Sequence, residues 1–111
     1  MEQVENIELV KQEVKDKLKA EHGDKLRSLL LPKDDYDTEY LEVLAVVPTR
    51  STTGQFMKFV NADPKKAQEI LVKNSLVTHK EEVLADDGLF SAAFGLVAEL
   101  IPVRQGKFGK V

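Results

Sequence analysis

The chain has 111 residues, of which 42% are hydrophobic and 32% are charged, and its formal net charge is −3. This length suits one domain with one hydrophobic core, and the interleaving of basic with acidic residues argues against a nucleic acid partner, since phosphate-binding proteins concentrate lysine and arginine on one face. The chain has no cysteine, which excludes disulfides, thiolate metal sites and a cysteine nucleophile.

The first predicted element is an amphipathic helix over residues 3–21. Its apolar residues recur at spacings of three and four, which is the helical period, and Gly23 follows where a left-handed backbone can end a helix. The apolar stripe consists of Val4, Ile7, Val10, Val14 and Leu18. It either packs on the chain's own core, which we favour, or meets a partner helix.

Residues 1–5 lack the basic start and apolar stretch of a secretory signal, so we expect a cytoplasmic protein.

Two short runs rich in leucine and valine come next, at residues 26–31 and 39–47. Residues 32–38 between them have the composition of a loop, so the pattern predicts a β-hairpin. The second run alternates between polar and apolar residues only at its beginning. Its later half is apolar on both faces and is expected to be buried.

A helix over residues 54–61 is predicted after the hairpin. Pro48 ends the second strand because proline has no amide hydrogen to donate. The hydroxyl residues Ser51, Thr52 and Thr53 are candidates for the N-cap of the helix, since their side chains can accept a hydrogen bond from a free backbone amide.

The next helix is predicted to begin at Asp63-Pro64 and to run toward Leu76. An aspartate at the N-cap followed by proline in the first turn is a typical helix start. Residues 78–82 are polar and are interpreted as a connection between helices.

The final predicted helix covers residues 88–101, with Asp86-Asp87 as its cap and Pro102 closing it. It is too short to span a bilayer, which needs about 20 apolar residues, so no membrane association is expected. Either it is the central core helix, or another chain covers one of its flanks. The residues that interrupt its apolar surface are Ser91, Gly95 and Glu99.

These elements predict an α+β fold with an N-terminal helix, a β-hairpin and a C-terminal bundle of about three helices. We expect one domain over residues 1–103. Residues 104–111 are basic and rich in glycine, without periodicity, and are predicted to form a mobile tail.

A search for chemistry finds no catalytic, metal or cofactor site. His22 and His79 have no ligand at helical spacing, and the acidic residues at 34–39 lack the register of an EF-hand loop. Helix capping explains Asp86-Asp87 more simply than acid–base catalysis does. The sequence therefore predicts a protein that is not an enzyme.

Aromatic residues supply the strongest indication of function. Phe56 and Phe59 lie on one predicted helix, and Phe90 and Phe94 lie one turn apart on another. Each alone is interpreted more readily as a core residue. Together they give more apolar helical surface than a domain of this size is expected to bury, which predicts self-association or binding of a protein partner. The predicted contact residues are Phe56, Phe59, Leu89, Phe90, Phe94 and Val97.

Several stretches, at residues 50–59, 63–74, 82–90 and 98–101, resemble the phage and prophage tail assembly chaperones. The resemblance implies a non-enzymatic protein that binds the tape measure protein in the bacterial host while the tail tube assembles. It also implies that a longer product can arise by translational frameshifting. Two alternatives stay open from the residues alone: a dimeric adaptor or regulatory domain with another protein partner, and a small enzyme or ligand-binding domain whose site is built from dispersed polar residues.

Overall fold

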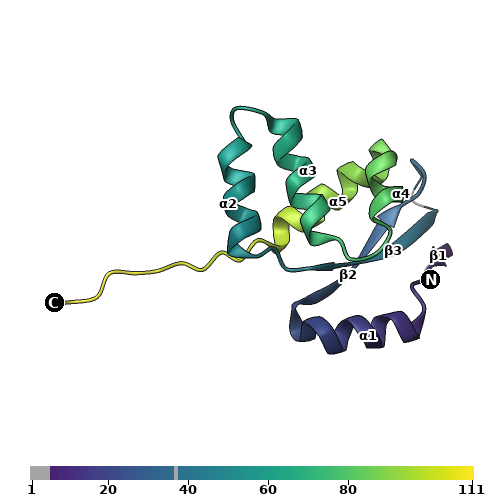
Figure 1. Cartoon of the computed structure of the whole chain (residues 1–111), viewed down its shortest axis with the longest axis horizontal. Coiled ribbons are helices and arrows are strands. Elements are labelled where there is room, and N and C mark those ends of the chain that lie inside the picture. Colours follow the sequence, from purple (N-terminus) through teal and green to yellow (C-terminus); the bar gives the residue numbers. More distant parts are fainter. Residues whose placement is uncertain (1–5, 37) are drawn as a thin grey trace.

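The structure is a computed structural model that describes residues 6–36 and 38–111. It contains helices and a small sheet, which confirms the predicted α+β class (Figure 1). The order of elements is β1 (Asn6–Glu8), α1 (Gln12–His22), a 3₁₀ turn η1 (Gly23–Lys25), β2 (Leu26–Pro32), β3 (Glu39–Val46), α2 (Arg50–Phe59), α3 (Pro64–Ser75), α4 (Lys80–Ala85) and α5 (Asp87–Leu100).

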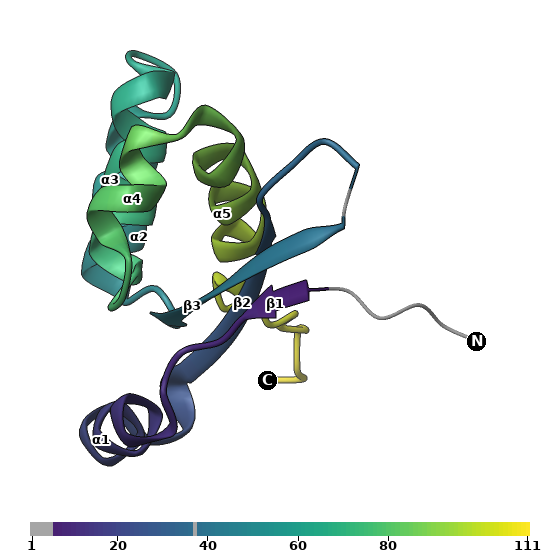
Figure 2. The same ribbon diagram turned by 90° about the vertical axis from the view of Figure 1, so that its right-hand side faces the viewer.

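The sheet has helices on both sides. Helices α2 to α5 gather on one side of it, and α1 lies on the other (Figures 1 and 2). The strand order is β1-β3-β2, so β3 is central. Strand β2 pairs antiparallel with β3, as the hairpin prediction required, and β1 pairs parallel with β3. The layout of helix, hairpin and helical bundle therefore roughly fits the prediction, and β1 and the short helix α4 are additional elements.

Alternation along β2 and β3 divides their side chains between two environments. One face carries Leu29 and Leu31 opposite Val43 and Leu41, and these residues pack with α3, α4 and α5. The other face carries Glu42 and Leu44, both buried. The later half of β3 is thus buried on both sides, as predicted. The buried core cluster consists of Leu29, Leu31, Leu41, Val43, Ala45, Leu71, Val72, Leu76, Val83, Leu89, Ala93 and Val97.

The N-terminal segment corrects the first prediction. Residues 3–5 of the predicted helix lie outside the described residues, residues 6–8 form β1, and the helix begins only at Gln12. The amide of Asn6 donates to the carbonyl of Thr38 at 3.2 Å, and the parallel ladder with β3 follows. Tertiary pairing therefore overrides the local helical period at Ile7. Gly23 does end α1 with a positive φ of 61°.

Two helix starts also differ from the prediction. Helix α2 begins at Arg50 because Thr49, rather than Ser51, Thr52 or Thr53, is its N-cap, and its Oγ1 accepts a hydrogen bond from the amide of Thr52 at 3.1 Å. The predicted polar connection at residues 78–82 runs into the short helix α4. This helix was not predicted because it begins with one lysine and two glutamates, which give the segment the polar composition of a loop.

The caps of α3 and α5 are confirmed. The side chain of Asp63 accepts a hydrogen bond from the amide of Lys66 at 3.2 Å, and Pro64 occupies the first turn of α3. The side chain of Asp86 accepts from the amide of Leu89 at 3.0 Å and begins α5.

Replacing the α5 cap by Asp86→Ala is expected to lower the free energy of unfolding by about 1 kcal/mol, because the amide of Leu89 loses its acceptor. The matched control is Asp87→Ala, which removes a first-turn carboxylate that only interacts with the helix dipole and should cost about 0.3 kcal/mol. Urea denaturation measures both values. Equal losses for the two variants would show that the cap hydrogen bond does not stabilise α5.

Candidate protein-binding surface

The structure brings together one phenylalanine from each of the two predicted helix pairs. The ring of Phe56 on α2 lies 6.1 Å from that of Phe94 on α5, with the ring planes tilted by 48°. This spacing is within the range in which aromatic rings attract one another. Both side chains are only partly buried, although they pack against the core cluster. The pair therefore joins α2 to α5 and leaves aromatic area at the surface.

Phe59 lies apart from that pair and is covered by lysines. The Nζ atom of Lys66 is 4.4 Å from the centre of its ring, and that of Lys58 is 5.7 Å away. Both distances suit attraction between a cation and an aromatic face. Phe59 is partly buried, and the lysines make its surroundings positively charged.

Helix α5 is the central core helix, which is one of the two interpretations of its apolar sequence. Leu89 and Val97 are buried in the core cluster, so in this structure neither side chain is open to a partner. Phe90 is partly buried. After the first turn of α5, the exposed residues are the three that interrupt its apolar sequence, Ser91, Gly95 and Glu99.

Helix α2 adds an exposed apolar side chain close in sequence to Phe56. Each of its residues is at least partly exposed, and Met57 is 60% exposed. A groove of about 350 Å³ separates the start of α2 from the end of α5, and its apolar wall includes Pro48, Ile101 and Pro102. We define the aromatic surface as Phe56, Met57, Phe94 and this groove. It offers apolar area beside Arg50, which also lines the groove.

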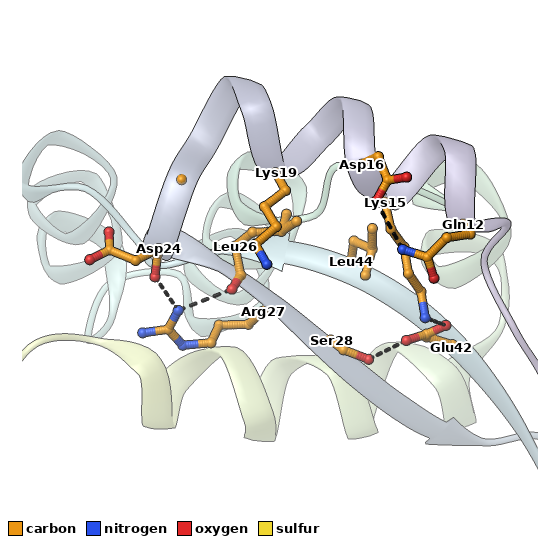
Figure 3. A pocket seen from close by; sticks show the side chains of 11 residues that line it. Gln12, Lys15, Asp16, Lys19, Asp24, Leu26, Arg27, Ser28, Glu42 and Leu44 are labelled. Atoms are coloured by element: carbon orange, nitrogen blue, oxygen red, sulfur yellow. Dashed lines mark hydrogen bonds and ion pairs between the residues drawn. The ribbon is translucent and has the colours of Figure 1, made fainter.

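A second groove, of about 460 Å³, lies between α1 and the sheet and contains none of the predicted contact residues (Figure 3). Its central polar group is Glu42, whose side chain is buried. Glu42 accepts hydrogen bonds from the amide of Val10 at 2.9 Å and from the Ser28 hydroxyl. The ammonium of Lys15 lies 3.0 Å from the same carboxylate. These partners attach α1 to the sheet.

The hydrogen bonds decide the protonation state of Glu42. Burial alone would raise the pKa of this carboxyl, but the donors Ser28, Lys15 and Val10 and the positive charge of Lys15 outweigh it and lower the pKa below its usual range. Glu42 is therefore ionised at neutral pH. A carboxylate held in this way is a structural tie and not a proton donor for catalysis.

The sequence did carry a signal for Glu42 that the prediction missed. Glu42 stands in the apolar run of residues 41–45, and alternation places it on the same buried face as Leu44. A charged residue at such a position requires partners. Those partners come from residues far away in the sequence, so their identity could not be predicted.

The two histidines lie at helix ends. His22 ends α1, with its Nε2 3.9 Å from the carboxylate of Glu21, and His79 is the N-cap of α4, with a positive φ of 56°. Among the described residues, no group of three or more histidine and acidic side chains could hold a metal ion. Within the same residues, every helix falls short of the length and apolarity required to cross a membrane.

Comparisons with known proteins identify the fold. No protein-family model and no curated protein matches the sequence. The chain is similar in structure to the uncharacterised protein rbstp2171 from Bacillus stearothermophilus, with a TM-score of 0.64 and 19% sequence identity. The similarity covers 86% of this chain and 99% of the other. At this identity the match shows that the two proteins share an α+β fold.

Proposed function

We propose that the protein is a non-enzymatic phage tail assembly chaperone that binds the tape measure protein in the cytoplasm of the bacterial host. The observation that carries the proposal is the partly exposed Phe56–Phe94 pair between α2 and α5. The stretches that resemble this family, at residues 50–59, 63–74, 82–90 and 98–101, form much of α2, α3, α4 and α5.

The physical argument concerns the client. A tape measure protein is a long, largely helical chain, and its apolar stripe promotes aggregation before the tail tube covers it. An amphipathic helix binds by placing its apolar stripe in a groove between helices. The aromatic surface provides such a groove beside α2, and the exposed Met57 can adapt to apolar side chains of different shapes. Arg50 at the groove favours a client with acidic residues next to the stripe.

The test is binding of a tape measure fragment from the same genome. Replacing one ring of the pair, by Phe56→Ala, should weaken binding at least tenfold, because an aromatic anchor is lost from the surface. The matched control is Tyr36→Ala, which removes an 83% exposed aromatic side chain far along the hairpin loop and should leave binding unchanged. Isothermal titration calorimetry measures the affinities, and circular dichroism confirms that each variant is folded.

A folded wild-type protein that binds no such fragment would contradict the proposal. If wild type and Phe56→Ala bind the fragment with equal affinity, the tape measure protein is still the client, but its binding site is not the aromatic surface. Neighbouring genes provide an independent check, since genes for the tail tube and tape measure proteins on either side favour the chaperone over an adaptor.

A further inference from the structure

A third groove, of about 490 Å³, lies where α3, α4 and α5 meet. Its apolar part is formed by Leu84, which is 36% exposed, and by the partly buried Phe90. Glu69 and Asp87, both exposed, line it with carboxylates, and Lys65 completes the lining. Helix α4 also carries Glu81 and Glu82 in its first turn, outside the lining of the groove. We call this site the acidic groove.

Residues 104–111 have the opposite chemistry. The segment contains Arg104, Lys107 and Lys110 and no acidic residue. It forms no helix or strand and extends away from the rest of the protein (Figure 1). Phe108 is fully exposed. An exposed aromatic side chain on an extended basic segment is costly to leave in water and is a suitable anchor for an apolar pocket.

Alternation along an extended chain sets which of these side chains act together. In a fully extended segment Arg104, Phe108 and Lys110 would lie on one side, with one cation about 7 Å after Phe108 and another about 13 Å before it. The acidic groove combines the complementary chemistries, since apolar Leu84 and Phe90 and the carboxylates of Glu69 and Asp87 line the same groove.

We propose that segment 104–111 of one copy binds the acidic groove of a second copy, with Phe108 against Leu84 and Phe90 and with its cations beside Glu69 and Asp87. Opposite charges orient the two surfaces, and the aromatic anchor supplies most of the affinity. Ordering a flexible segment opposes binding, so the association is weak and depends on concentration.

Binding to the same copy is disfavoured by geometry. The segment leaves the last turn of α5, whereas Asp87 and Phe90 belong to its first turn. A helix of 14 residues is about 21 Å long. The chain from Ile101 to Phe108 reaches about 25 Å at full extension, so binding to the same copy would need a reversal at Pro102 and a nearly fully extended segment lying back along α5. In the structure the segment instead extends away from the helices (Figure 1).

A contact of this kind is head-to-tail. Each copy that binds one neighbour through its segment still has an open groove, so copies add to one another in open chains or closed rings. The inference concerns contacts between copies and does not depend on the identity of the client.

Sedimentation velocity at several protein concentrations tests the inference. The sedimentation coefficient of the wild-type protein should rise with concentration and fall on addition of salt. Phe108→Ala and Glu69→Lys should each weaken association at least tenfold, because one removes the anchor and the other reverses a groove charge. Tyr36→Ala, which removes another exposed aromatic residue, is the matched control and should associate like the wild type.

Mixing the two defective variants gives the sharpest result. Phe108→Ala retains the groove and Glu69→Lys retains the segment, so together they should form one-to-one dimers that grow no further. A wild-type protein that stays monomeric at every concentration would overturn the inference. Association that is insensitive to Phe108→Ala, or a monomer whose segment binds its own groove by nuclear magnetic resonance, would overturn it equally.

Discussion

Glu42→Ala is expected to lower the free energy of unfolding by about 2–3 kcal/mol. The substitution removes a buried carboxylate and leaves the amide of Val10, the hydroxyl of Ser28 and the ammonium of Lys15 without their acceptor. Urea denaturation at pH 7 gives the value. Because Glu42 ties α1 to the sheet, the amides of α1 should also lose protection from hydrogen exchange in the variant.

The matched control is Glu8→Ala. Glu8 pairs with Lys33 at 3.0 Å, and both side chains are substantially exposed, so its removal should cost less than about 1 kcal/mol.

The pH dependence of the free energy of unfolding adds a second control. The pKa of Glu42 is lowered in the folded protein, so its stabilisation is complete above the unfolded pKa of glutamate and is lost as the pH falls through the folded pKa. The stability difference between wild type and Glu42→Gln should therefore shrink from pH 7 to pH 3; a constant difference would contradict the assigned charge.

Leu71→Ala is expected to lower the free energy of unfolding by about 3 kcal/mol. Leu71 lies on α3, is fully buried and belongs to the core cluster that joins the helices to the sheet. Truncation removes apolar contacts and leaves a cavity that its packed neighbours cannot fill. Thermal or urea denaturation measures the loss.

The comparison for this core substitution is Leu30→Ala, the same chemical change at a side chain that is 43% exposed. Water fills the space left when the exposed Leu30 side chain is truncated, so no closed cavity forms. The free energy of unfolding is therefore expected to fall by less than about 1 kcal/mol. Similar losses for the two variants would mean that the interior around Leu71 is not the main source of stability.

The local features of the fold were predictable because short stretches of sequence determine them. Asp63 with Pro64 and Asp86 before the apolar run predicted where α3 and α5 begin, since an N-cap acts on amides only two or three residues away. The hairpin followed from two apolar runs around a loop. Strand β1 could not be predicted, because its three residues become a strand only by pairing with β3.

The candidate site was predictable only in part. The phenylalanines were recognised as unusual, and Phe56 and Phe94 do meet at the surface of α2 and α5. Sequence could not separate them from Leu89 and Val97, because the side of α5 that enters the core depends on how the helix is rotated against the sheet. Glu42 was missed because Val10, Lys15 and Ser28 come together only in the folded chain.

The parallel pairing of β1 with β3 has a consequence for the order of folding. Strands β2 and β3 are joined by a short loop, whereas Asn6 must find Glu39 across the whole of α1 and β2. Closing a longer loop costs more chain entropy. The β2–β3 hairpin is therefore expected to form first, and β1 is expected to pair with β3 last. A nascent chain that has emerged only as far as β3 would already form this hairpin, which is most of the sheet.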